Sequence, residues 1–167
     1  MDKNKFTKIL KEWLNNFLKK KLSSTHEILE VVIPQSSLSK INNQYIKQIP
    51  NYSSWEFKPD IFAVLRNKAS NKLELIILNR STSALSLKEI GEINCYARLT
   101  GAYMAFLTSL NAVSNEVSIL LLDDTIKNRV LDYGKDKKII VFGWDEKNNQ
   151  INKDSVIPFE QKDFLSS

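Results

Sequence analysis

The sequence contains few of the residues that build metal cages, disulfides and flexible low-complexity chains. Its one cysteine, Cys95, cannot form a disulfide within the chain, and its one histidine, His26, leaves no partner for a Cys/His metal site. A Ser/His/Asp hydrolase would depend on His26 alone, and no GxSxG motif is present. Glycine and proline together number 8 of 167 residues, or about 5%, whereas average usage would give roughly 12%. Collagen-like and low-complexity chains are therefore excluded.

The sequence also has no long apolar run and no phosphate-binding glycine loop. No 18-residue stretch is free of charge, which argues against a membrane-spanning helix, and the N-terminus lacks the pattern of a secretory signal. We therefore expect a cytoplasmic protein, and a length of 167 residues with 43% hydrophobic residues predicts one domain over residues 1–167. Lys and Arg number 24 against 19 Asp and Glu, and the resulting net charge of +5 favours contact with polyanions.

The clearest periodic pattern lies at the N-terminus and predicts an amphipathic helix over residues 3–22. Large apolar residues recur there at the i, i+3, i+4 and i+7 spacing of one helix face. The opposite face is rich in lysine and ends in a basic cluster. This basic face is either an ordinary solvated surface or a surface that contacts the phosphates of a nucleic-acid backbone. The cluster consists of Lys19, Lys20 and Lys21.

The remaining patterns predict strands and helices that alternate along the chain. Runs of β-branched and apolar residues predict strands at 27–33, 61–65, 73–78, 102–109 and 138–144. Helical spacing predicts a helix over 87–101, and a second helix that follows an N-cap at Ser114 and runs in pieces to Gly134. A short helix is expected within 38–49, before Pro50.

This order of elements predicts an α/β (α+β) fold with a central mixed β-sheet flanked by helices on both faces. The core of the fold is expected over about residues 27–144. The chain from Asp145 to residue 167 is expected to form a C-terminal arm, either ordered or with a weak strand at 156–159.

One group of motifs carries a family resemblance. Lys58-Pro59-Asp60 opens the first strand of a predicted hairpin, the second strand reads LELIILNR, and a helix containing Glu92 and Tyr96 follows. This arrangement resembles the PD-(D/E)xK nuclease superfamily, which has the restriction-endonuclease-like fold. The helix is similar to the Gln-x-x-x-Tyr helix of RecB-like members, with Glu92 in place of the glutamine. The similarity covers residues 58–109 by motif and extends to 144 by element order.

The resemblance implies a site in which two carboxylates hold Mg²⁺ and a lysine stabilises the attacking water or the developing charge. The acid-x-lysine motif corresponds to Ile77-Leu78-Asn79 or, with a shift of one residue, to Leu78-Asn79-Arg80. The second acid is missing in either alignment. Asn79 can position a water but carries no charge, and Arg80 is too basic for proton transfer. The implied catalytic residues are Asp60, Asn79, Glu92 and Tyr96, with Asp60 and Glu92 as the Mg²⁺ ligands of an active form.

Three hypotheses about function follow. The first is a nuclease-like domain with an incomplete catalytic motif that binds nucleic acid or acts in assembly, with little or no cleavage. The second is a Mg²⁺-dependent DNA endonuclease that uses Asp60 with Glu92 or Glu89, although both glutamates also suit an ordinary helix surface. The third is a protein-interaction module, such as a homodimer, that uses exposed aromatic residues (Tyr52, Trp55 and Trp144). Bound DNA would contact Lys58, Arg80, Arg98, Lys19, Lys20 and Lys21.

Overall fold

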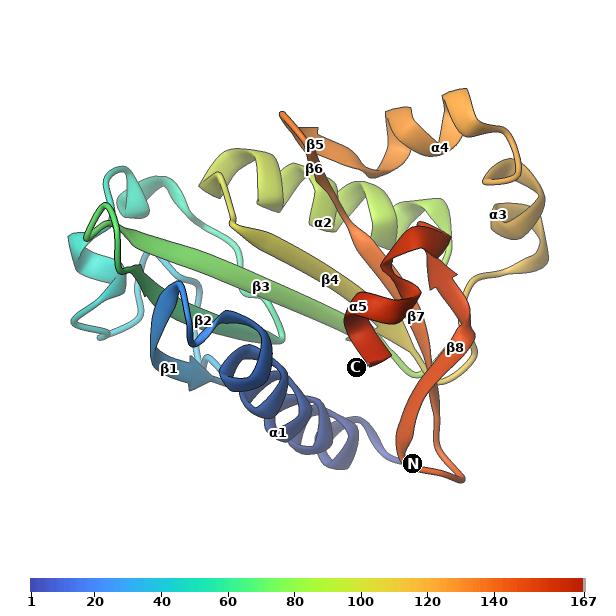
Figure 1. Cartoon of the computed structure of the whole chain (residues 1–167), viewed down its shortest axis with the longest axis horizontal. Helices are drawn as coiled ribbons and strands as arrows, with labels where there is room; N and C mark the ends of the chain where they lie inside the picture. The colour runs from blue at the N-terminus through green and yellow to red at the C-terminus, as the bar shows by residue number, and fades with distance from the viewer. Residues whose placement is uncertain (167) are drawn as a thin grey trace.

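The computed structural model describes residues 1–166 and contains a six-stranded mixed sheet with the order β1-β2-β3-β4-β7-β8 (Figure 1). Strands β1, β2 and β3 form an antiparallel meander, β3-β4 and β4-β7 are parallel pairs, and β8 returns antiparallel to β7. The expected mixed sheet is thus confirmed. Its strands are β1 His26–Val32, β2 Ile61–Asn67, β3 Leu73–Ser81, β4 Met104–Ser109, β7 Ile140–Asp145 and β8 Gln150–Ile157.

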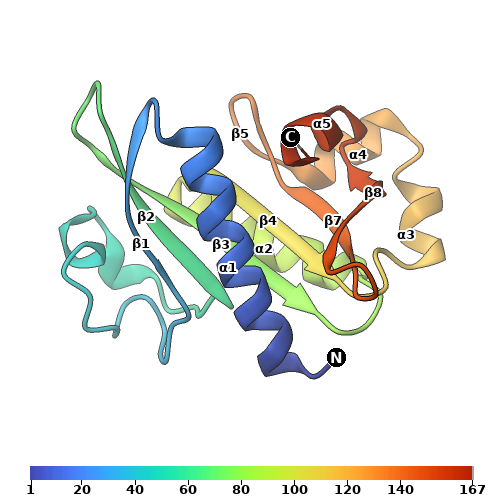
Figure 2. The same ribbon diagram turned by 60° about the horizontal axis from the view of Figure 1, so that its bottom comes forward.

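Helices cover both faces of this sheet. Figures 1 and 2 show α1 crossing one face and α2 lying along the other. Within residues 1–166, no helix is long and apolar enough to cross a bilayer. The helices are α1 Lys3–Leu22, α2 Leu87–Thr100, α3 Asn115–Leu120, α4 Asp124–Leu131 and α5 Lys162–Ser166. A separate small hairpin pairs β5 Asp132–Gly134 with β6 Lys137–Lys138, and single 3₁₀ turns occupy Ile46–Gln48, Tyr52–Ser54 and Phe159–Gln161.

The core beneath α1 is rich in aromatic rings. The α1 helix has the bounds that its periodicity predicts, and the carboxylate of Asp2 caps it by accepting a hydrogen bond from the backbone of Lys5. Phe106 on β4 is fully buried there, with its ring centroid 5.7 Å from Trp13 and 5.8 Å from Phe17. Edge-to-face contacts of this kind add to the burial of apolar area. The α1 helix is therefore held to the sheet mainly by apolar and aromatic packing.

The other face of the sheet is covered by α2, α3 and the long segment between β1 and β2. The α2 helix begins with a capping box: the hydroxyl of Ser86 caps the first turn, and the side chain of Glu89 accepts the backbone N–H of Ser86. It ends at Gly101, whose φ of 60° is the left-handed conformation that suits a residue without a Cβ. The prediction of this helix is confirmed.

Replacing Ser86 with alanine should cost about 1 kcal/mol of unfolding free energy, because the first turn of α2 loses its cap. Burial raises the pKa of Glu89, but the hydrogen bonds from Ser86 outweigh it and hold that pKa below its ordinary value of 4.5. The stability that the hydrogen bonds between Ser86 and Glu89 contribute is therefore fully present above pH 4.5, and it is lost as the pH falls through the lowered pKa of Glu89. Urea unfolding of the wild type and of Ser86→Ala, at neutral pH and near pH 3, should show that the difference between their unfolding free energies is smaller in acid.

Ser83→Ala is the matched control, because Ser83 is exposed in the turn before the cap. Its unfolding free energy should stay within about 0.5 kcal/mol of the wild type. Equal losses in the two variants would contradict a specific role for the cap.

Residues 38–49 form no α-helix, contrary to the prediction. The amide oxygen of Asn43 accepts hydrogen bonds from the backbone of Tyr45 and Ile46, and only a single 3₁₀ turn follows. A side chain that satisfies the backbone locally competes with helix formation. The apolar residues that suggested a helix, such as Leu38 and Ile41, instead pack into or against the core and fix the segment to the sheet.

The C-terminal end of the chain also differs from expectation. The strand expected at 156–159 is β8, which spans Gln150–Ile157 and forms one edge of the sheet. Ile151 and Val156 face the core under α1, whereas the residues between them are largely polar. This pattern is typical of an antiparallel strand with one face exposed to solvent. The helical segment after Ser114 ends at Leu131 rather than at Gly134, because Gly134 belongs to the β5-β6 hairpin.

Candidate functional site

The start of β2 and the end of β3 bring Asp60, Asn79 and Arg80 together. Ile61 pairs with Leu78 in the antiparallel ladder, so the residue before β2 lies opposite Asn79. The backbone N–H of Asp60 donates to Oδ1 of Asn79 at 3.2 Å, and the backbone N–H of Arg80 donates to Oδ2 of Asp60 at 2.8 Å. These reciprocal bonds fix the carboxylate at the point where the two strands separate.

Arg80 is held rigidly and is almost wholly buried, with a side chain only 6% exposed. Its Nη2 lies 3.5 Å from Oδ1 of Asp60, and its Nε donates to Oγ1 of Thr7 on α1 at 2.8 Å. Burial lowers the pKa of Arg80 while the charge of Asp60 opposes that shift, and the guanidinium stays charged at neutral pH. Because Nη1 makes no hydrogen bond within residues 1–166, it remains available to a ligand.

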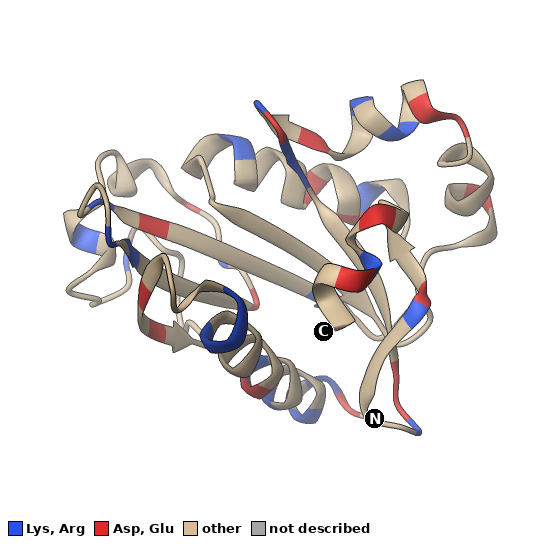
Figure 3. Cartoon of the chain, in the orientation of Figure 1, with Lys and Arg blue, Asp and Glu red and all other residues tan. Residues whose placement is uncertain are grey.

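A cavity of about 500 Å³ lies beside this pair. Figure 3 shows the lysines along α1, and two of them reach the cavity wall. None of the three lysines in the lining makes a side-chain hydrogen bond or ion pair within residues 1–166. With four cations against one carboxylate, the wall carries a net charge of +3. The lining consists of Lys3, Asn4, Thr7, Lys8, Ile33, Pro34, Gln35, Lys58, Asp60 and Arg80.

The donor set of this cavity does not fit Mg²⁺. Both carboxylate oxygens of Asp60 are already paired with Arg80, and the amide oxygen of Asn79 accepts the backbone N–H of Asp60. Mg²⁺ requires several free oxygen ligands and is repelled by surrounding cations. Across residues 1–166, no group of three or more His, Cys, Asp or Glu side chains could hold a metal ion. The arrangement instead suits an anion.

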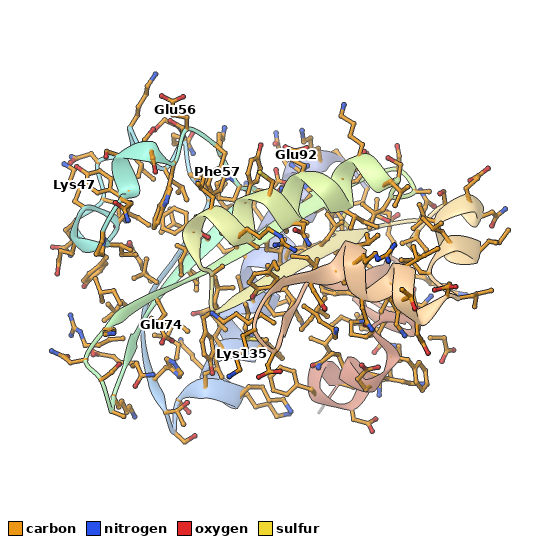
Figure 4. The ribbon with its side chains drawn as sticks, turned by 90° about the horizontal axis from the view of Figure 1, so that it is seen from above. Lys47, Glu56, Phe57, Glu74, Glu92 and Lys135 are labelled. Atoms are coloured by element: carbon orange, nitrogen blue, oxygen red, sulfur yellow. The ribbon has the colours of Figure 1, made fainter. Side chains whose placement is uncertain are left out.

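Glu92 and Tyr96 lie on the face of the sheet opposite α1. The hydroxyl of Tyr96 donates to Oε1 of Glu92 at 3.0 Å, and its ring stacks on Phe57 with a centroid separation of 4.0 Å. Burial, together with the negative Glu92, raises the pKa of Tyr96 to about 12. Figure 4 shows Glu92 projecting from α2, and neither residue lines the cavity at Asp60. Glu89, the other helix-borne acid, is engaged in the capping box.

The predicted phosphate contacts separate into different parts of the molecule. Lys58 and Arg80 line the cavity. Arg98 instead supports the packing of α2, since its Nε donates to Asn94 and its Nη2 donates to the carbonyl of Asp132. The cluster Lys19–Lys21 occupies the last turn of α1, about 24 Å along the helix axis from Lys3 at 1.5 Å per residue. The cluster therefore does not contribute to the cavity.

Two of the three aromatic residues expected at an interaction surface are buried. Trp55 is 1% exposed and Trp144 is 4% exposed, and each packs in the core, on opposite faces of the sheet. Tyr52 is partly buried against the core beside Trp55. The prediction that Trp55 and Trp144 are exposed is wrong, because a large apolar ring in a loop or at a strand end can complete the core.

Sequence reasoning missed the contribution of α1 to this site. Thr7 is 5% exposed and lies on the same helix face as Leu10 and Leu14, at the i+3 and i+7 spacing. A hydroxyl on the buried face of an amphipathic helix needs a hydrogen-bond partner, which here is Arg80. Thr7, a polar residue on the apolar face of α1, was the one feature of the sequence that could have indicated this contact. Lys3, one turn before Thr7, and Lys8, the residue after it, also line the cavity.

Comparisons with protein-family models, with curated proteins and with solved structures found no match.

Proposed function

We propose that this protein is a nucleic-acid-binding domain with a nuclease-like fold whose degenerate active site holds a phosphate group rather than Mg²⁺. One observation carries the proposal: the carboxylate at the position of a metal ligand, Asp60, is paired with the buried Arg80 inside a cavity lined by three unpaired lysines. A metal site concentrates negative charge, whereas this site concentrates positive charge. The domain is accordingly a binding module with little or no cleavage activity.

The restriction-endonuclease-like fold is part of the proposal, and the order of elements supports it. The strand that begins after Pro59-Asp60 is antiparallel to its successor, which is followed by a helix and a parallel strand. The PD-(D/E)xK resemblance requires this succession. Fold alone does not establish activity, so the chemistry of the cavity decides between binding and cleavage.

Nucleic acid is the class of ligand that this charge favours. Lysines and an arginine held in a concave wall attract phosphates, and their contacts release counterions, so that affinity falls steeply as salt rises. Arg80 offers a planar guanidinium that is already oriented by Thr7 and Asp60. An oriented cation loses less side-chain freedom on binding than a mobile one.

The decisive experiment replaces Asp60 with asparagine. Fluorescence anisotropy should measure binding of a labelled 20-base-pair DNA duplex at several KCl concentrations, with Mg²⁺ or with EDTA, and gels should monitor cleavage. Asp60→Asn should bind about threefold to tenfold more tightly, because it removes the one negative charge of the cavity wall. The amide oxygen of asparagine can still accept the backbone N–H of Arg80.

Glu116→Gln is the matched control, because it removes one negative charge from α3, on the other face of the sheet from α1. Its affinity should equal that of the wild type. Mg²⁺-dependent cleavage that disappears in Asp60→Asn would establish the active endonuclease instead. Failure of the wild type to bind DNA at low salt would overturn the proposal and favour the protein-interaction alternative.

A further inference from the structure

Resting on the proposed function, we infer that the cavity beside Arg80 takes the terminal phosphate of a nucleic-acid strand rather than an internal phosphodiester. The relevant chemistry is that of a phosphate monoester, at either a 5′ or a 3′ end. The charge of the wall, the oriented Arg80 and the continuation of the cavity along α1 each support this assignment.

The charge of the wall matches a monoester better than a diester. An internal phosphodiester carries one negative charge, whereas a terminal phosphate carries about 1.5 to 2 at neutral pH. The wall presents four cations, and only Arg80 has a carboxylate partner. Lys3, Lys8 and Lys58 thus leave an excess of positive charge that a single diester would not balance.

The cavity is open to solvent, and several elements contribute to its walls. The first turns of α1 form one wall, residues 33–35 after β1 form another, and the adjoining ends of β2 and β3 form the base. An internal phosphodiester needs an exit for the chain on both sides of the phosphate. A terminal phosphate needs only one exit.

That exit is marked by a second cavity of about 330 Å³ along α1. It is lined by Lys8, Lys11, Glu12, Asn15 and Val31, so Lys8 belongs to both cavities. Lys8 and Lys11 lie one helical turn apart and can follow a backbone that leaves the first cavity. The guanidinium of Arg80, oriented by Thr7 and Asp60, lies in the first cavity, where the terminal group would bind.

Four otherwise identical duplexes test the inference: one with hydroxyl ends, one with 5′-phosphates, one with 3′-phosphates and one with both. Anisotropy at a fixed intermediate salt concentration should show at least one phosphorylated end binding about fivefold or more tightly than the hydroxyl ends. Comparison of the 5′ and 3′ arms identifies which end is bound. Inorganic phosphate at millimolar concentration should lower the affinity for the phosphorylated end more than the affinity for hydroxyl ends, and so reduce this preference.

Lys58→Gln should reduce the preference for a phosphorylated end, whereas Lys153→Gln, which removes the same charge from the exposed face of β8, should retain it. Equal binding of all four duplexes by the wild type would overturn the inference and leave the proposed function intact. A preference that survives in Lys58→Gln and also in Arg80→Gln would overturn the assignment to this cavity. Absence of binding to every duplex would overturn the proposed function and this inference together.

Discussion

Replacing Arg80 with glutamine is expected to lower the affinity for duplex DNA at least tenfold, which corresponds to about 1.4 kcal/mol or more of binding free energy. Arg80 is the most buried cation in the cavity wall and the one whose geometry is fixed, by Thr7 and Asp60. Its loss removes a phosphate donor and also leaves Asp60 as an unpaired negative charge inside the site. The slope of log affinity against log salt should fall in magnitude by about one.

Arg129→Gln is the control for this prediction, because Arg129 is an exposed guanidinium on α4 and its removal changes the net charge equally. Its affinity should remain within about twofold of the wild type. The affinity of Arg80→Lys should lie between those of Arg80→Gln and Arg129→Gln, since lysine keeps the charge without the planar guanidinium. Equal affinities for Arg80→Gln and Arg129→Gln would show that net charge, and not this cavity, governs binding.

Phe106→Ala should have the largest effect on stability, about 3–5 kcal/mol of unfolding free energy. The ring is fully buried beneath α1 and contacts Trp13, Phe17 and Phe142 in edge-to-face or tilted geometry. Alanine leaves a cavity that these rings cannot refill without moving. The melting temperature should fall by about 6–20 °C for a chain of this length, as measured by calorimetry or circular dichroism.

The control for the core substitution is Phe159→Ala. Phe159 is 63% exposed, and its ring lies 5.0 Å from the ammonium group of Lys162. Its removal should change stability by about 0.5–1 kcal/mol or less. A loss in Phe106→Ala as small as in Phe159→Ala would mean that α1 is not held to the sheet by this aromatic contact.

The fold could be predicted wherever the chain repeats a periodic pattern. The helix α1, the hairpin of β2 and β3, and the N-cap at Ser114 all follow from local sequence, and the structure has them. The segment 38–49 could not be predicted, because the hydrogen bonds of Asn43 and the burial of Ile46 outweigh its weak helical spacing. The length of strand β8 was underestimated, because an edge strand buries only one face and its sequence therefore has few apolar residues.

The candidate site could be predicted only in part, for a physical reason. Asp60 and Asn79 are brought together by a hairpin whose register follows from the sequence. The contact between Arg80 and Thr7 spans 73 positions along the chain, and no local pattern specifies it. Glu92 and Asp60 belong to neighbouring motifs, but the helix that carries Glu92 lies on the face of the sheet opposite α1.

The walls of the cavity come from α1, from the end of β1 and from the β2-β3 pair, so they meet only when α1 is packed on the sheet. The native state therefore has a cationic cavity that the unfolded chain lacks. A ligand that binds only the native state stabilises it by about 2.7 kcal/mol when its concentration is one hundred times the dissociation constant. Folding and the proposed nucleic-acid binding would in this sense be linked equilibria, and the linkage would run through α1, which both packs on the core and supplies lysines to the cavity.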